Sequence, residues 1–166
     1  TAVQTSYFAP SDTYFRLVRD HAIHPQGPQW HEARALAAQM TYKGRPGRLA
    51  KIVDRELFAW VSSTFPLSTI KWADGATWIG LRYWCKARVL SWVDMTAHPH
   101  SEFAPWTVPW HMGGTPACTG RKASYLGVFH LGRANGWQAV APQKRFPHYI
   151  VEFPPRAAAN QFSRAK

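Results

Sequence analysis

Short apolar segments rich in β-forming residues recur through the middle and the end of the chain, separated by polar or breaker-rich stretches. Each segment is shorter than a helix requires and has no helical period, so each predicts a strand. The predicted strands cover residues 14–18, 78–81, 91–94, 125–130, 137–140 and 149–153. The first of them alternates large apolar with basic residues, which is typical of a half-buried strand. We expect the central segments to share one sheet.

Two helices are predicted upstream of the central strands. Residues 29–40 place apolar side chains at spacings of three and four, which gives a helix one apolar stripe. The stripe consists of Trp30, Ala33, Leu36, Ala37 and Met40. Glu32 lies in the first turn, where the helix dipole favours a negative charge. Residues 56–65 predict the second helix, which stops at Pro66, and residues 43–47 form a breaker-rich turn between the two.

A long run full of Pro, Gly and Trp lies between the strand at 91–94 and the Gly136-Trp137 pair. It has no helical period. Long loops of this kind are uncommon in a small domain unless they are functional, and binding residues concentrate on loops that a rigid scaffold positions. We therefore expect this run to carry the binding surface.

Several motifs occur in the order and spacing of a known family. Residues 78–81 read Trp-Ile-Gly-Leu and residues 91–94 read Ser-Trp-Val-Asp; Gly136-Trp137 follows the long run, and residues 149–153 read Tyr-Ile-Val-Glu-Phe. This series resembles the C-type lectin-like domain, which has a WIGL strand, a W-V-D strand, a long loop, a G-W-N-D strand and a final hydrophobic–Glu strand. The resemblance implies an α+β fold, in which two helices flank small antiparallel sheets with a long irregular loop.

The resemblance extends upstream and suggests the domain limits. Residues 29–34 resemble the opening of the family's first helix, and residues 47–52 resemble its G-x-L-A-x-I link to the second helix. We expect one domain at 14–153, in agreement with the chain length of 166 residues. Residues 1–13 are polar and irregular and predict an N-terminal arm, and residues 154–166 predict a basic C-terminal tail.

The acidic residues that the family uses to hold calcium are missing. Sugar-binding members carry a Glu-Pro-Asn or Gln-Pro-Asp triplet in the long loop and an Asn-Asp pair after the last loop tryptophan. Here residues 113–117 read Gly-Gly-Thr-Pro-Ala and residues 136–139 read Gly-Trp-Gln-Ala. Calcium requires about six to eight oxygen ligands, several of them carboxylates, yet no Asp or Glu occurs from Phe103 through Gly136. The sequence predicts that this calcium-dependent sugar site is absent, and that the protein uses no metal and no other cofactor.

Without the metal, the face of the long loop remains available for binding. The expected ligand-binding residues are Trp106, Trp110, His111, Arg121, Lys122, Tyr125 and Arg133. Tryptophans in such a loop can also be core residues, and we favour that role for Trp92, Trp110 and Trp137. For Trp106 the core role and the role of a binding anchor are about equally supported. An exposed aromatic residue near prolines makes a good anchor because it loses little entropy when it is ordered.

These observations predict a non-enzymatic, calcium-independent recognition module that binds a protein or a glycan. The alternative is a structural or accessory subunit of a large assembly, organellar or ribonucleoprotein, that uses its basic surface and termini. Its basis is the net charge of +11, with 20 basic against nine acidic residues, which attracts polyanions such as RNA. Interleaved aromatic and basic residues at 42–45 and 144–146 are typical of surfaces that track phosphates. The same charge can also simply keep an aromatic-rich surface soluble.

Neither cysteine fits a usual bridge position of the family. Cys85 follows the WIGL strand and Cys118 lies in the long loop, so we expect two free thiols. Free thiols slightly favour a reducing or organellar compartment over an extracellular or periplasmic one. No segment reaches the apolar length that would span a bilayer.

Other chemistries find little support. His98 and His100 could bind a transition metal, but the proline between them and the lack of a regular element make the geometry unspecific. Cys118 would need a histidine placed beside it to act as a nucleophile, and nothing in the sequence places one there. The carboxylates are scattered, and Glu152 resembles the structural residue of the family's final strand. We therefore expect no catalytic residues.

Overall fold

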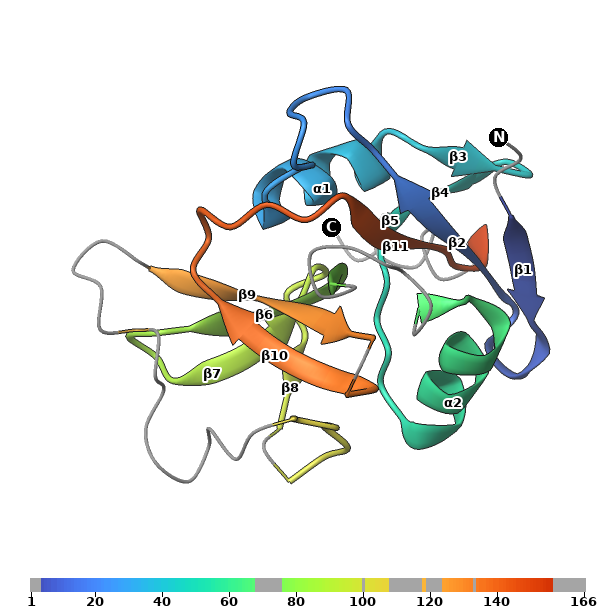
Figure 1. The fold of residues 1–166 in the computed structure, drawn as a ribbon. Helices are drawn as coiled ribbons and strands as arrows, with labels where there is room; N and C mark the ends of the chain where they lie inside the picture. Colours follow the sequence, from blue (N-terminus) through green and yellow to red (C-terminus); the bar gives the residue numbers. More distant parts are fainter. Residues whose placement is uncertain are drawn as a thin grey trace, which may run out of the picture.

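The computed structural model describes residues 4–67, 76–99, 101–107, 118, 124–132 and 134–156 of the chain (Figure 1). The helices in these ranges are η1 (Ala9–Ser11, a 3-10 helix), α1 (Trp30–Ala38) and α2 (Arg55–Thr64). The strands are β1 (Thr5–Phe8), β2 (Thr13–Arg19), β3 (Thr41–Tyr42), β4 (Arg45–Pro46), β5 (Arg48–Leu49), β6 (Ala76–Trp84), β7 (Val89–Trp92), β8 (Ala97–His98), β9 (Tyr125–Leu131), β10 (Gly136–Val140) and β11 (His148–Phe153). The α+β class is confirmed.

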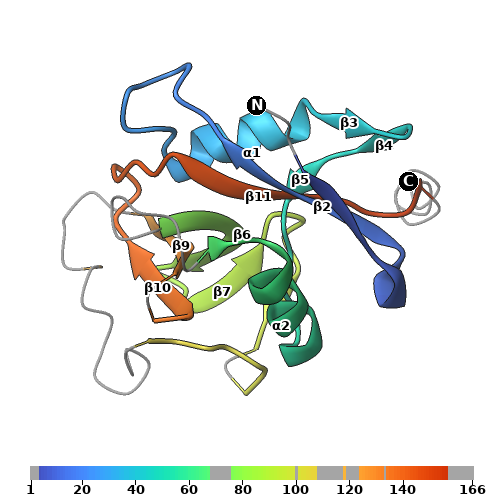
Figure 2. The ribbon, with the colours of Figure 1, turned by 45° about the vertical axis from the view of Figure 1, so that its right-hand side comes forward.

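Apart from the small β3–β4 hairpin, the strands form one sheet with two halves. One half has the order β1-β2-β11, and the other has the order β10-β9-β6-β7-β8. The halves meet where β11 runs parallel to β6, with His148 opposite Thr77 and Tyr149 opposite Trp78. The other strand pairs are antiparallel. Helix α1 packs against β5 and β6, and α2 packs against β1 (Figure 2).

The central strand β6 contains the WIGL motif and is buried along almost its whole length. Its glycine permits a close approach by the link between the helices. The Gly80 N–H donates to the Ala50 carbonyl at 2.9 Å, and a Cβ on Gly80 would lie only 2.7 Å from the Leu49 carbonyl oxygen. A larger residue would push this link away from the strand.

Both predicted helices form, and side chains cap their first turns. At α1, the Gln29 N–H donates to the Glu32 carboxylate at 2.9 Å as part of a capping box. The Asp54 carboxylate accepts from the Leu57 N–H at 2.8 Å at the start of α2. None of the helices in the described residues is long and apolar enough to cross a membrane.

Large aromatic residues fill the core. Trp30, Trp78, Trp92 and Trp137 are all buried. The indole N–H of Trp30 donates to the Ile79 carbonyl and that of Trp78 donates to the Pro28 carbonyl, both at 2.9 Å. A buried indole needs such a partner. These two bonds tie the start of α1 to the central strand.

The acidic residues of the W-V-D and closing-Glu motifs are structural. Glu152 on β11 pairs with Arg48 at 2.8 Å, and Asp94 after β7 pairs with Lys51 at 2.7 Å. Burial tends to raise the pKa of Asp94, but hydrogen bonds from Lys51 and Thr96 outweigh it and lower the pKa to about 2. Both acids therefore hold the link between the helices against the sheet.

The prediction of an irregular N-terminal arm is wrong for residues 5–8. These residues form β1, an edge strand paired with β2, and Phe8 packs against Phe15 and Trp60. Strands β3, β4, β5 and β8 were not predicted either. Each has only two residues and therefore lacks a periodic pattern of its own.

Candidate functional site

The long loop joins β8 to β9 and covers residues 99–124. Seven residues on and around it were predicted to bind the ligand, and the structure describes two of them, Trp106 and Tyr125. The other five lie outside the described residues: Trp110, His111, Arg121, Lys122 and Arg133.

At its start, the loop is hydrogen-bonded to β10. The Trp137 N–H donates to the Pro105 carbonyl at 2.8 Å, and the Thr107 N–H donates to the Trp137 carbonyl at 3.0 Å. One side-chain bond follows, from the Gln138 amide to the Thr107 hydroxyl at 2.7 Å. This part of the loop is therefore positioned by the sheet.

Beneath this attachment lies a cluster of rings, which we call the loop base: Trp92, His98, Phe103, Trp106 and Trp137. Trp137 is at its centre, with 0% of its surface exposed, and its ring centroid lies 5.9–6.3 Å from those of the other four. The predicted core role is confirmed for Trp92 and Trp137, while Trp110 lies outside the described residues. Trp106 is half-buried and packs edge-on against Trp137.

His98 belongs to this base, and among the described residues it is not part of any group of three or more His, Cys, Asp or Glu that could hold a metal ion. It is buried, and its Nε2 lies 2.7 Å from the Phe103 carbonyl oxygen. The second histidine considered for a metal site, His100, lies outside the described residues.

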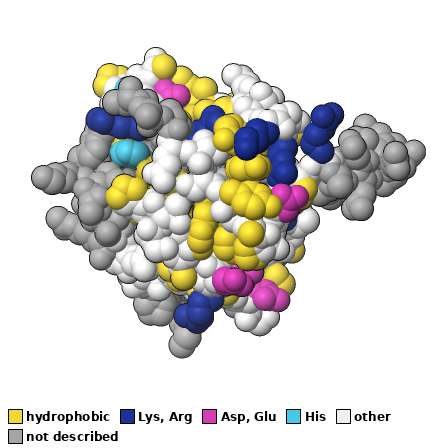
Figure 3. Space-filling view, turned by 90° about the vertical axis from the view of Figure 1, so that its right-hand side faces the viewer, with side chains coloured by type: hydrophobic (Ala, Val, Ile, Leu, Met, Phe, Trp, Pro, Cys, Tyr) yellow, Lys and Arg dark blue, Asp and Glu magenta, His cyan; other side chains and the backbone are white. Residues whose placement is uncertain are grey.

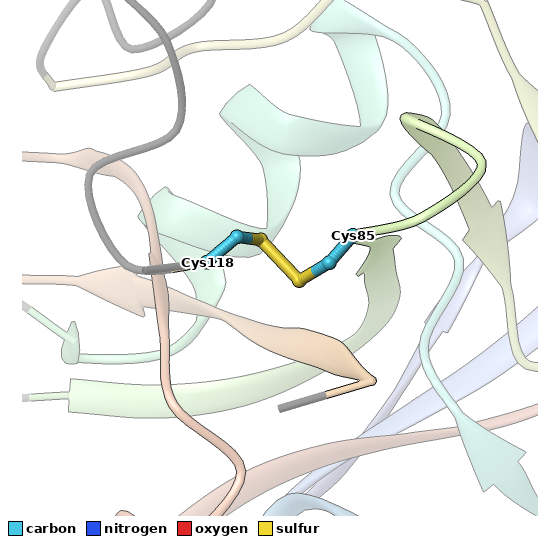
Figure 4. Close-up of a disulfide and its surroundings, with 2 residues drawn as sticks. All are labelled: Cys85 and Cys118. Atoms are coloured by element: carbon cyan, nitrogen blue, oxygen red, sulfur yellow. A yellow bond between two sulfur atoms is a disulfide. The ribbon is translucent and has the colours of Figure 1, made fainter. Parts of the chain in front are cut away.

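Further along, the loop is attached to the sheet by a disulfide between Cys118 and Cys85 (Figure 4). The prediction of two free thiols is therefore wrong. The bond joins residues 33 apart in the sequence, with a Cα–Cα distance of 5.8 Å. The sequence missed it because neither position matches a usual bridge of the family. The slight preference for a reducing compartment loses its basis, since disulfides persist in oxidising environments.

Beside the disulfide, the end of β6 carries a buried cation that the sequence analysis overlooked. Arg82 is only 6% exposed, and its guanidinium lies 4.5 Å from the ring centroids of both Trp30 and Trp84 and 5.4 Å from that of Tyr125. Burial, and then the charge of Arg34, lower the pKa of Arg82. Cation–π contacts of this kind stabilise a desolvated cation. An arginine between aromatic residues in an otherwise apolar strand was the signal that could have found it.

Trp106 and Tyr125 do not lie together. Trp106 contacts Trp137, which is paired with His130, five residues along β9 from Tyr125. That spacing corresponds to about 17 Å along a strand. Side chains alternate along a strand, so Tyr125 and His130 also point to opposite faces of the sheet. Trp106 packs into the cluster around Trp137, whereas Tyr125 packs against Trp30. The structure therefore does not bring the two residues onto one face, and we call the surface of the long loop around Trp106 and Thr107 the loop face.

The residues at the family's sugar-binding position do not fit calcium. By the resemblance, Gln138 and Ala139 stand where sugar-binding members have Asn and Asp, and the Gln138 amide is bonded to a hydroxyl. The sequence has no Asp or Glu from Phe103 through Val151. Among the described residues, no group of three or more His, Cys, Asp or Glu is arranged to hold a metal ion. The carboxylates that calcium requires are missing from this position.

No protein-family model matches the sequence, and no curated protein matches it either. Solved structures do match over nearly the whole chain. The cow C-type carbohydrate-recognition domain of CD23, in the presence of a GlcNAc2Man3 oligosaccharide, is 17% identical with a TM-score of 0.61, covering 91% of this chain and 93% of that one. Human lithostathine is 16% identical with a TM-score of 0.62, and the match covers 91% of this chain and 88% of that one.

A third match comes from an invertebrate lectin. The C-type lectin CEL-I from Cucumaria echinata is 16% identical with a TM-score of 0.61, covering 90% of this chain and 95% of that one. At such low identity these likenesses establish the architecture and leave the ligand open. Together with the motif order and the two-part sheet, they show that the chain has the C-type lectin-like fold.

Proposed function

We propose that this chain is a non-enzymatic recognition module that binds a glycan through its loop face without calcium. The observation that carries the proposal is the Gln138–Thr107 hydrogen bond, which occupies the family's sugar-binding position with neutral groups. A glycan is the favoured ligand because the structure of the cow CD23 domain, which has the same fold, was determined in the presence of an oligosaccharide.

The attachment of the loop face supports binding without a metal. Calcium commonly organises a long loop, but here the β10 hydrogen bonds position the loop near residue 107 and the disulfide positions it at Cys118. Points of attachment that are already fixed reduce the conformational entropy lost when the loop binds. The described parts of the loop, residues 101–107 and Cys118, therefore need no cation to attach them to the sheet.

The charge of the loop face also favours this mechanism. The sequence offers no carboxylate from 103 to 151, and Arg121, Lys122 and Arg133 add positive charge within and beside the long loop. Positive charge repels a divalent cation and attracts electronegative groups. Sugar hydroxyls would then be bound by amide, hydroxyl and guanidinium groups, with Trp106 offering a ring surface.

The disulfide argues against the one catalytic hypothesis that the sequence raised. A thiolate is the nucleophilic form of cysteine, and Cys118 cannot form one while it is bonded to Cys85.

A glycan array probed with the purified chain, with calcium and with excess EGTA, tests the proposal. We expect the same glycans to bind in both conditions. Gln138→Ala combined with Trp106→Ala should reduce binding about tenfold or more, because a polar contact and a ring contact are lost together. Gln39→Ala, the same amide change at the exposed end of α1, is the matched control and should bind like the wild type.

Thermal melts of each variant separate lost contacts from lost folding. Binding that disappears with EGTA would overturn the calcium-independent mechanism. Binding to protein ligands but to no glycan would assign the loop face to protein recognition and overturn the glycan assignment.

A further inference from the structure

We propose that the face built from β1, β2 and the β3–β4 hairpin is a second binding surface, which takes a linear sulfated or carboxylated polysaccharide. We call it the basic-aromatic surface, and it consists of Tyr7, Tyr14, Arg16, Tyr42, Lys43, Arg45 and Arg156. It lies on the half of the sheet that does not carry the loop face. The proposal therefore stands or falls separately from the function proposed for that face.

Aromatic rings form a continuous row on this surface. The ring centroids of Tyr7 and Tyr14 are 4.8 Å apart, those of Tyr14 and Tyr42 are 5.1 Å apart, and those of Tyr42 and Phe153 are 5.7 Å apart. Tyr7 is 46% exposed, Tyr14 and Tyr42 are half-buried, and Phe153 is buried. The row therefore runs from solvent into the core and is anchored at one end.

Cations lie over these rings. Arg16 lies 5.2 Å from the ring centroid of Tyr42, Lys43 lies 5.0 Å from that of Tyr14, and Arg45 also lies 5.0 Å from that of Tyr14. Cation–π contacts at exposed sites contribute about 0.5–1 kcal/mol each. They restrict long side chains that would otherwise sample many rotamers, so less entropy is lost when an anion binds.

Most of this positive charge has no internal acidic partner. Arg45 pairs with Asp12 at 3.2 Å, and Asp12 also accepts from the Tyr7 hydroxyl at 2.8 Å. Within the part of the chain that the structure describes, no carboxylate lies within ion-pair distance of Arg16 or Lys43.

A further cation joins the group at the hairpin turn. The guanidinium of Arg156 lies 3.7 Å from the position that a Cβ on Gly44 would take. Among the described residues, the surface therefore carries four cations, and the one carboxylate paired with any of them is that of Asp12. Figure 3 shows Lys and Arg side chains gathered beside hydrophobic ones on this side of the molecule. Charge complementarity points to a polyanion.

Two observations favour a polysaccharide over a nucleic acid. Single-stranded nucleic acids bind by stacking bases on open aromatic faces, but Tyr14 is covered by both Lys43 and Arg45, and Tyr42 by both Arg16 and Lys43. The Cys85–Cys118 disulfide indicates an oxidising environment, where nucleic acid is not the usual polyanion. The surface thus offers fixed cations and few free ring faces.

The test measures binding of the full chain to heparin, alginate, neutral dextran and oligo-dT over a range of salt concentrations. The wild type should bind heparin or alginate with an affinity that falls steeply as salt increases, and it should not bind dextran. Lys43→Gln combined with Arg156→Gln removes two exposed charges and should weaken that binding about tenfold at low salt, with a shallower salt dependence.

Lys86→Gln combined with Lys144→Gln is the matched control, because it removes the same charge from exposed positions outside the surface. If the two double variants lose the same affinity for heparin or alginate, the polysaccharide is attracted by the net charge of the protein alone, and the proposal is overturned. A wild type that binds neither acidic polysaccharide would also overturn it. If oligo-dT binds more tightly than both polysaccharides and shows the same dependence on Lys43 and Arg156, the polysaccharide assignment is overturned in favour of nucleic acid.

Discussion

The loop base and the basic-aromatic surface are both built from aromatic residues, but their rings have different neighbours. In the loop base, Trp137 is surrounded edge-on by other rings and is completely buried. On the basic-aromatic surface, Tyr14 and Tyr42 lie beneath arginine and lysine side chains. Ring-to-ring packing therefore stabilises the fold, whereas ring-to-cation packing holds charged groups in place at the surface.

The strongest test of this difference removes the centre of the loop base. Trp137→Ala should lower the free energy of unfolding by about 3–5 kcal/mol, because a large buried ring is lost and a cavity remains. Urea denaturation followed by circular dichroism measures the change. A loss below about 1 kcal/mol would mean that the loop base is not a stabilising core.

Reducing the disulfide should have the next largest effect. The bond closes a loop between residues 33 apart, for which the chain-entropy model gives about 3–4 kcal/mol. Urea unfolding of Cys85→Ser with Cys118→Ser, compared with the wild type before and after reduction, measures this. If reduction leaves the stability of the wild type unchanged, the two cysteines are free thiols.

Acid should lower the free energy of unfolding by protonating buried histidines. It should have no such effect through the basic-aromatic surface, which has no histidine. Burial, and then the charges of Arg19 and His21, lower the pKa of His148 to about 4. Its unfolded value is about 6.5, so the unfolded state binds the proton first. His148 therefore contributes stability that is fully present above about pH 6.5 and is lost as the pH falls toward 4.

The measurement is the free energy of unfolding between pH 7 and pH 4. We expect a decline on the order of 1–3 kcal/mol from this group. His148→Gln should flatten the decline, although His130, whose pKa burial also lowers, contributes in the same direction. An equally steep decline in the variant would show that His148 is not responsible.

The smallest expected change in stability, and the finest test of the comparison, comes from Tyr14→Leu. The substitution keeps every charge but removes the ring beneath Lys43 and Arg45. Stability should fall by about 1 kcal/mol, while affinity for heparin should fall severalfold because the two cations lose their fixed positions. Unchanged affinity would mean that net charge alone governs binding.

The sequence predicted the elements whose signals are local. The WIGL strand and both helices follow from periodicity, apolar runs and breakers, and the buried role of Trp92 and Trp137 follows from the general tendency of tryptophan to be buried. It could not predict β3, β4, β5 and β8, because two-residue strands exist only through their neighbours. Strand β1 was overlooked because it has only four residues, two of them small and polar, which is too short for a clear alternation.

The candidate site was less predictable than the fold. The Cys85–Cys118 bond depends on where the fold carries the long loop, and spacing in the sequence does not reveal that. An arginine in an otherwise apolar strand is a local signal for Arg82, but its contacts with Trp30, Trp84 and Tyr125 come from three elements and depend on the fold. By contrast, the absence of Asp and Glu from Phe103 through Gly136 follows directly from the sequence.

We propose that this C-type lectin-like fold presents a loop face that uses no calcium. The decisive measurement is isothermal titration of the metal-free protein with CaCl₂. We expect no saturable heat and an unchanged melting temperature in excess calcium. A micromolar Kd would contradict it, and calcium at about one hundred times that Kd would then stabilise the fold by about 2.7 kcal/mol.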